Sequence, residues 1–155
     1  MSRKPVVGIE FSRPLPVDRV PRKGSHEHIK ADPQECLGLA RRFNIPVLHA
    51  LSARLLAAPW RGGGLKVTGT VEADLDQFSV ISLEPFREKL NFGVERYFLP
   101  PKDSADAAID DAEPVIDGIV DLGELVAEEL GLELDPYPRK QGENYINPDE
   151  ETPKK

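Results

Sequence analysis

The sequence has very little of what several protein classes require. One cysteine, Cys36, is present among 155 residues, which excludes an internal disulfide framework and a zinc site made of four thiolates. No apolar run approaches the ~20 residues that a membrane-spanning helix needs, and the apolar residues that follow the basic N-terminus are too few for the core of a signal peptide. We therefore expect a cytoplasmic protein that has no contact with a membrane.

Basic residues are also absent from one long stretch. Between Asp103 and Asp135 the chain has 12 acidic residues and neither Lys nor Arg. The net charge is -7, but residues 1–66 have 12 basic and 5 acidic side chains (+7), whereas residues 67–155 have 8 and 22 (-14). Such a split indicates either partners that are selected by charge or two solvated faces that attract each other.

What is present supports one modest domain. Hydrophobic residues make up 39% of the chain, which is enough for a single core, although 15 prolines leave little room for long regular elements. Single domains usually have about 100–150 residues. We expect one domain over residues 1–139, with a flexible acidic loop over residues 102–113 and a disordered polar tail over residues 140–155.

The clearest helix signal lies near residue 32. Asp32, Pro33 and Glu35 combine a capping side chain, a proline suited to the first turn and a glutamate that can reach back to the cap. Apolar side chains follow at helical spacing, and Pro46 stops the pattern. A helix is therefore predicted over about residues 33–43.

A second helix is predicted after Asp121, where Glu124 repeats the spacing of the first cap. Its apolar stripe consists of Leu122, Leu125, Val126 and Leu130. Gly131 is the expected end of this helix. The helix's acidic side chains are expected to face water; they are Glu124, Glu128 and Glu129.

Residues 65–76 alternate without exception between apolar or glycine positions and polar ones, which predicts an antiparallel strand with one buried face. Residues 47–58 fit either a helix or a strand, and the glycine-rich loop at 60–64 favours a hairpin and hence a strand. Residues 86–98 repeat the alternation less cleanly. These three strands would form a meander.

Shorter strands are expected at residues 5–11 and 26–30, and residues 78–81 could extend the long strand past a bend. Between the expected strands at residues 5–11 and 26–30, the chain is expected to form a basic arm over the surface. The arm contains Arg13, Arg19, Arg22 and Lys23. The expected fold class is α+β, with a strongly twisted antiparallel β-sheet that could be barrel-like and two amphipathic helices.

Few residues suggest catalysis or metal binding. His26 and His28 share one face of a strand with no third ligand near them in sequence, which favours ordinary surface histidines. Cys36 with His49 could form a nucleophile pair, but Cys36 lies on the apolar helix face, which favours a buried structural cysteine. We expect no enzymatic activity, no metal and no cofactor.

Four blocks carry a family resemblance. They are residues 67–73 (VTGTVEA), 82–86 (SLEPF), 119–130 (IVDLGELVAEEL) and 134–140 (LDPYPRK). In this order they resemble the YceD-like family of large ribosomal RNA subunit accumulation proteins, and most closely its alphaproteobacterial branch, over roughly residues 5–140. The resemblance implies a role in ribosome assembly or rRNA maturation, with no catalytic activity or cofactor to transfer.

The chain departs from the resemblance at one place. Many relatives have cysteines three positions apart before the Leu-Glu-Pro block, where this chain has Ser79 and Ser82. Serine hydroxyls bind zinc poorly. A metal or thiol at these positions is therefore not essential to the fold.

Seven residues are candidates for contact with a partner. They are Arg41, Arg42, Glu84, Pro85, Tyr137, Arg139 and Lys140. Glu84 and Pro85 also fit a simple bend between strands, and Tyr137 could instead pack the tail onto the sheet. No small-molecule substrate is evident.

Two kinds of partner are considered. The acidic residues 103–135 would attract a basic ribosomal or ribosome-assembly protein. The basic first half would suit direct contact with rRNA phosphates, although a pI of about 5.0 counts against an RNA-binding protein. We favour a protein partner and keep direct rRNA binding as the alternative.

Overall fold

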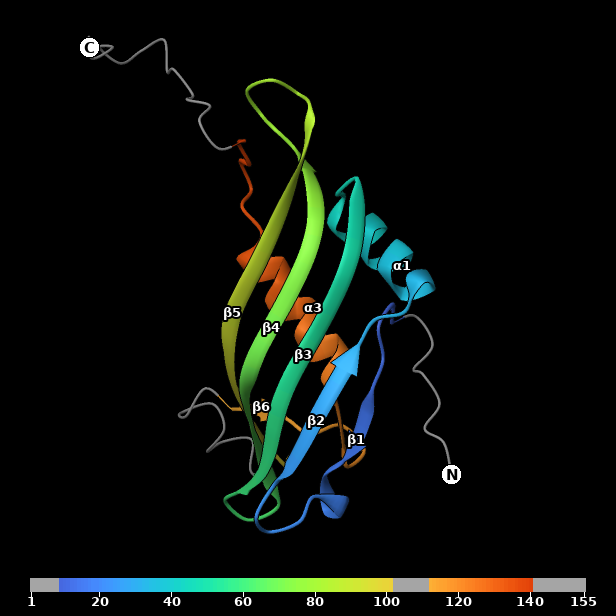
Figure 1. Ribbon diagram of the computed structural model, residues 1–155. Helices are drawn as coiled ribbons and strands as arrows, with labels where there is room; N and C mark the ends of the chain where they lie inside the picture. Colours follow the sequence, from blue (N-terminus) through green and yellow to red (C-terminus); the bar gives the residue numbers. More distant parts are fainter. Residues whose placement is uncertain (1–8, 102–111, 141–155) are drawn as a thin grey trace, which may run out of the picture.

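The computed structural model describes residues 9–101 and 112–140, which form a five-stranded sheet, a two-stranded sheet and two α-helices (Figure 1). The predicted α+β class is confirmed. The elements follow the order β1 (Pro14–Pro16), the 3-10 helix η1 (Val17–Arg19), β2 (Ser25–Lys30), α1 (Pro33–Phe43), β3 (Val47–Trp60), β4 (Gly64–Phe78), β5 (Pro85–Leu99), β6 (Glu113–Pro114), β7 (Ile119–Asp121) and α3 (Leu122–Glu133).

Strands β3, β4 and β5 form the predicted antiparallel meander. The alternation in β4 has the expected consequence, because its apolar side chains face the core and Leu65, Val67, Val71 and Leu75 are fully buried. The β3–β4 hairpin turns through Arg61 and Gly63, which adopt positive φ angles of 52° and 86°. Residues 47–58, which fit two patterns, are thus a strand.

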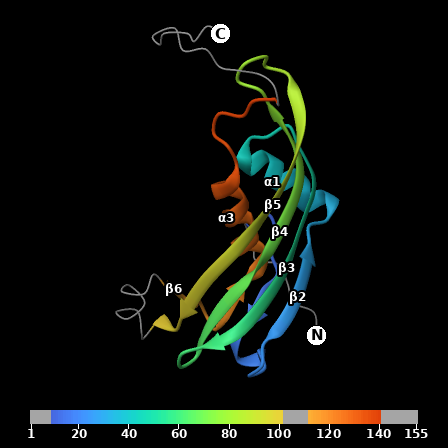
Figure 2. The same cartoon turned by 60° about the vertical axis from the view of Figure 1, so that its left-hand side comes forward.

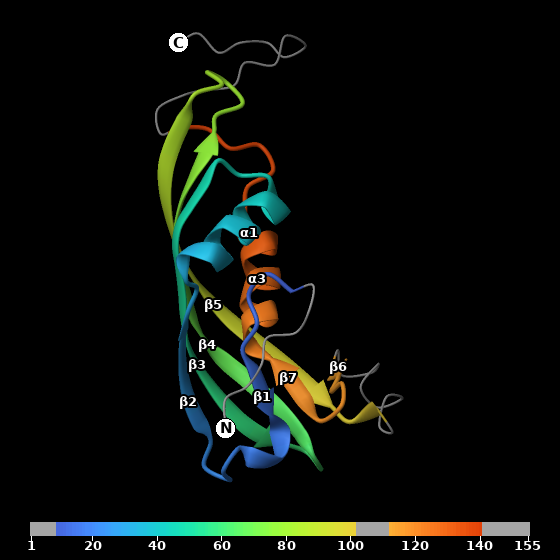
Figure 3. The ribbon, with the colours of Figure 1, turned by 90° about the vertical axis from the view of Figure 1, so that its right-hand side faces the viewer.

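The five-stranded sheet has the order β2-β3-β4-β5-β6 and remains open within the described part of the chain, so the barrel-like form is wrong. The reason is that two helices and one short strand pair, and not a continuous second wall of strands, cover the core. Helices α1 and α3 and the β1–β7 pair all lie on one side of the sheet (Figure 3). We call this side the inner face and the opposite side the outer face.

Helix α1 begins with the predicted capping box. The Glu35 N–H donates to Asp32 Oδ1 at 2.8 Å, and the Asp32 N–H donates to Glu35 Oε1 at 2.9 Å. Helix α3 has the simpler cap, in which the Glu124 N–H donates to Asp121 Oδ1 at 3.1 Å. Both helices bury their apolar stripes, so burial of one face and local capping specify them together.

Three local predictions are wrong. Gly131 lies inside α3, where a Cβ would be 2.8 Å from Phe43 Cε1, so the glycine allows close packing against α1 instead of ending the helix. Residues 79–81 belong to the β4–β5 loop, because the Ser79 side chain binds the loop backbone. Residues 9–11 are the described part of the first expected strand, and they are not in a strand. The Phe11 side chain is instead fully buried in the hydrophobic core.

The basic arm is partly fastened to the core. The Arg13 guanidinium donates to both oxygens of Glu35, at 2.7 and 2.8 Å, and the Arg13 N–H donates to Asp121 Oδ1 at 2.7 Å. Strand β1 pairs with β7 directly after this contact. The N-terminal segment is therefore bound to the start of α3.

The acidic side chains of α3 do not simply face water. Glu124 binds Arg42 of α1 at 2.9 Å, while Glu128 and Glu129 bind Arg96 of β5 at 2.8 and 3.1 Å. The sequence could not place these arginines opposite the helix. Part of the charge split is thus satisfied by attraction inside the fold.

The predicted acidic loop at 102–113 lies outside the described residues except for its last two positions, and the predicted tail lies outside them from residue 141 onward. Among the described helices, none combines the length and the hydrophobicity of a membrane span.

Candidate functional site

The β4–β5 loop, residues 79–84, is built around Ser79. The Ser79 side chain is completely buried, and its Oγ accepts hydrogen bonds from the N–H groups of Ile81 (3.0 Å) and Ser82 (3.3 Å). The Ser79 backbone N–H donates to the Glu84 carbonyl at 2.9 Å and closes the loop. The loop is therefore a defined structure at one end of the sheet.

The segment after α3 returns to this loop. The Val80 N–H donates to the Pro138 carbonyl at 2.8 Å, and Lys140 forms an ion pair with Glu84. The Asp135 side chain accepts from the Tyr137 N–H at 2.8 Å, which shapes the turn before Pro138. We call residues 78–85 together with residues 134–140 the tip surface.

Large apolar side chains are exposed on the tip surface. Phe78, Val80, Leu83 and Tyr137 are 53%, 42%, 75% and 73% exposed, respectively. Leu83 has a φ of 63°, which is unusual for a residue with a side chain of this size. Val80, Asp135, Tyr137 and Arg139 line a shallow hollow between the two segments. The tip surface thus combines exposed apolar side chains with a hollow that is lined from both of its segments.

The structure brings together five of the seven candidate residues. Glu84 and Pro85 come from the loop and the start of β5, and Tyr137, Arg139 and Lys140 come from the returning segment. Arg41 is exposed on α1 and lies outside this surface. Sequence reasoning found these residues singly but missed Phe78, Val80 and Leu83, whose exposure has no sequence signal.

Arg42 has a structural role. Its guanidinium donates two hydrogen bonds to Glu124, both at 2.9 Å, and one to Glu10 at 3.1 Å. These bonds, those to Glu124 first, raise the pKa of Arg42 above its ordinary value. Since the side chain already joins α1 to α3, we do not include Arg42 in the tip surface.

The serines at the family's cysteine positions have different surroundings. Ser79 supports the loop from inside, whereas the Ser82 hydroxyl accepts from the Glu84 N–H at 3.4 Å near the surface. Among the described residues, no group of three or more His, Cys, Asp or Glu side chains could hold a metal ion.

Cys36 and His49 do not form a pair. Cys36 is 7% exposed, and burial is the main cause that raises the pKa of its thiol above the ordinary value. His49 Nε2 lies 2.9 Å from Asp76 Oδ1 on the outer face. Cys36 is thus a buried structural cysteine, as the apolar helix pattern predicts.

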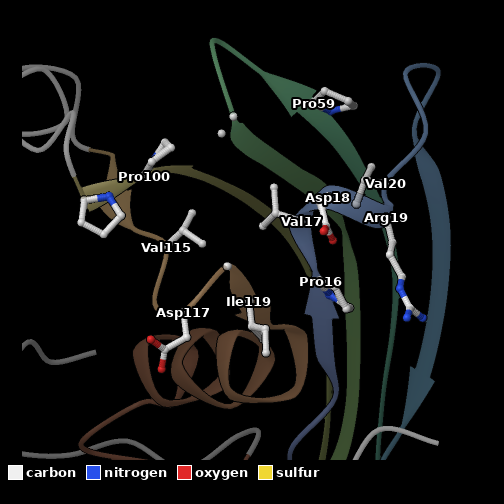
Figure 4. A pocket seen from close by; sticks show the side chains of 14 residues that line it. Pro16, Val17, Asp18, Arg19, Val20, Pro59, Pro100, Val115, Asp117 and Ile119 are labelled. Carbon is white, nitrogen blue, oxygen red and sulfur yellow. The ribbon is translucent and has the colours of Figure 1, made fainter. Parts of the chain in front are cut away.

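A wide hollow at the opposite end of the molecule offers little chemistry (Figure 4). Its walls are mostly proline, glycine and aliphatic side chains from η1, the β3–β4 hairpin and the start of β7. Arg19 and Asp117 lie on opposite sides of it (Figure 4). The charged groups do not converge on a common point, so we place no site there.

The outer face gathers aromatic and basic side chains that are far apart in sequence. The Trp60 and Tyr97 rings lie 4.7 Å apart between centroids, with the Arg61 guanidinium 4.6 Å from the Trp60 ring and Lys66 Nζ 5.6 Å from the Tyr97 ring. Exposed Arg54 lies further along the same face, on the same side of β3 as Trp60. The sequence shows no such interleaving, because the strand register creates it.

The described residues define an α+β protein in which two helices cover one face of an open, mostly antiparallel sheet. This chain belongs to the YceD family: residues 67–154, more than half of the chain, match the family described as "Large ribosomal RNA subunit accumulation protein YceD". The predicted family is confirmed, and both segments of the tip surface lie within the match. No curated protein and no solved structure matches the chain.

Proposed function

We propose that this protein is a non-enzymatic factor that supports accumulation of large-subunit ribosomal RNA by binding a ribosomal or ribosome-assembly protein through its tip surface. The family description supplies the process. The observation that carries the binding surface is the set of four exposed apolar side chains on a hydrogen-bonded loop and its docked segment.

Such a surface suits a protein partner. Interfaces gain most of their binding free energy from a few apolar or aromatic anchors that become fully desolvated. Leu83 and Tyr137 are the most exposed of the four and lie on the two different segments. Because the loop is already ordered by Ser79, binding would lose less conformational entropy than binding by a free loop.

The charge argument for a protein partner is weaker than the sequence indicates. Four of the acidic residues between Asp103 and Asp135 already form ion pairs with arginines of the same chain; they are Glu113, Glu124, Glu128 and Glu129. We therefore base recognition on apolar contact at the tip surface and assign the remaining acidic charge to steering.

The test is affinity purification of the tagged chain from its own cells with and without nuclease. We expect a ribosomal or assembly protein to remain after nuclease treatment. Changing Leu83→Ser together with Tyr137→Ser should weaken the purified partner's affinity at least about tenfold, since two anchors are removed. The control Leu37→Ser alters a leucine that is 55% exposed on α1 and should leave the affinity unchanged.

Loss of every protein partner after nuclease would contradict this proposal and favour direct rRNA binding. The outer-face cluster of Trp60, Tyr97, Arg61 and Lys66 is the specific observation behind that alternative, since aromatic rings and cations together bind single-stranded nucleic acid. In that case Lys66→Glu should reduce RNA recovery and the tip variant should not. RNA affinity should also fall steeply with salt.

A further inference from the structure

Strand β5 has a long edge with no partner strand in the described part of the chain. Its other edge pairs with β4 over its length, from Pro85 to Phe98, whereas β6 covers only Phe98 and Leu99. The edge from Arg87 to Tyr97 is therefore open. Figure 2 shows β5 along the margin of the sheet.

Alternate residues of β5 direct their backbone N–H and C=O groups to the open edge. The Leu99 carbonyl accepts from the Val115 N–H at 2.8 Å, so residue 99 directs its backbone groups away from β4. In an antiparallel strand the N–H and C=O of one residue point to the same edge, and successive residues alternate. Six residues thus present their backbone groups to the open edge: Arg87, Lys89, Asn91, Gly93, Glu95 and Tyr97.

The edge lacks two common protections against pairing, an interrupting proline and a bulge. Strand β5 has no proline after Pro85, and its register with β4 runs without a shift. Natural edge strands are usually short, bulged or interrupted by proline, because a long regular edge is a template for another strand. The uninterrupted edge of β5 is therefore suited to strand addition.

We propose that β5 pairs antiparallel with β5 of a second copy of this chain, around a two-fold axis at Phe92, so that two sheets join into one. Phe92 is the midpoint of the open span from Arg87 to Tyr97. A partner strand centred there would use the whole open edge and end where β6 begins. The six residues whose backbone groups point to the open edge then lie opposite one another across the two strands and form hydrogen-bonded pairs.

Side chains match in this register. Lys89 lies opposite Glu95 of the second copy, and by symmetry Glu95 lies opposite the second copy's Lys89; both side chains are exposed on the outer face. On the inner face Leu90 meets Val94, and the two Phe92 rings meet at the axis. Opposite charges and apolar pairs directly across two strands are the arrangements that stabilise a sheet.

Neighbouring registers leave Lys89 without an opposite charge across from it. A two-fold axis at Asn91 places Glu95 opposite Arg87, which already binds Asp74 of its own chain, but it leaves Lys89 opposite Gly93 and Glu88 opposite Val94. An axis at Gly93 places Lys89 opposite Tyr97. Of these three registers, the axis at Phe92 is therefore the one that places an opposite charge across from Lys89, and an unrelated extended peptide would have no such match to supply.

Sedimentation equilibrium over a range of concentrations tests the proposal. The natural chain should form a dimer. Lys89→Glu and Glu95→Lys each place like charges opposite each other twice, so each should raise the dissociation constant at least about tenfold. The double variant restores opposite charges and should return to within about threefold of the natural chain.

A mixture of the two single variants gives the sharpest result. One chain then has Glu at both positions and the other has Lys at both, so the two should pair with each other although neither pairs with itself. Lys30→Glu makes the same charge change at an exposed position of β2. It is the matched control and should not alter dimerisation. A chain that is monomeric at every concentration, or single variants that dimerise like the natural chain, would overturn the proposal.

Discussion

Replacing Gly69 with alanine should cost about 3–5 kcal/mol of the free energy of unfolding, out of a total of about 5–15 kcal/mol that is typical of a domain. Gly69 has a φ of +155°, where side chains are strained. A Cβ at this position would lie 2.8 Å from Leu55 Cα and closer still to the Arg54 carbonyl oxygen. Both neighbours are backbone of β3, so relief requires the centre of the meander to move. Urea denaturation followed by circular dichroism measures the loss.

Gly93→Ala is the matched control. Gly93 pairs with Thr70 on the neighbouring strand, and a Cβ there meets only the Gly69 carbonyl oxygen at 3.7 Å, an ordinary contact. The change should alter stability by less than about 1 kcal/mol. Equal losses for the two glycines would show that close packing of β3 against β4 is not what Gly69 provides.

Arg96→Met should have the second-largest effect, a loss of about 2–3 kcal/mol. The Arg96 side chain is 15% exposed and binds Glu113, Glu128 and Glu129 at 2.5 to 3.1 Å. These bonds, chiefly those to Glu113, raise the pKa of Arg96 above its ordinary value, so it stays charged. Without it three carboxylates face each other with no cation between them.

The loss of unfolding free energy in Arg96→Met should be smaller in high salt, because ions screen the repulsion among the partly exposed glutamates. Arg87→Met is the control, since Arg87 binds Asp74 on the open surface and its loss should shift the unfolding midpoint much less than the loss of Arg96 does. Unfolding midpoints in urea at low and high salt compare the two variants. A salt-independent loss would attribute the effect to the contact of the Arg96 guanidinium with the Phe98 ring, 5.9 Å from its centroid, instead of to the glutamates.

Local patterns account for the elements that were predicted correctly. The Asp32 capping box and the alternation of residues 65–76 each need only neighbours in sequence, so their consequences can be read from one segment. The prediction for Gly131 is wrong because it considers only neighbours in sequence. A glycine near the end of a helix fits a terminator, but here the close contact with Phe43, which is distant in sequence, requires a residue without a side chain.

The candidate site depends on contacts between distant segments. Tyr137 and Glu84 were singled out as contact residues, yet only the Val80–Pro138 hydrogen bond shows that their segments meet. The ion pairs of Arg42 and Arg96 also connect residues that no sequence spacing relates. The unequal charge of the two halves was visible, but how much of it the fold neutralises was not.

The pairing of β1 with β7 sets an order of events during translation. The Arg13 N–H and its acceptor Asp121 are 108 residues apart, which at about 5–20 residues per second separates their synthesis by about 5–20 s. The β3–β5 meander consists of neighbours in sequence and can form in that interval. Strand β1 must therefore wait for its partner β7 until that later segment has been made.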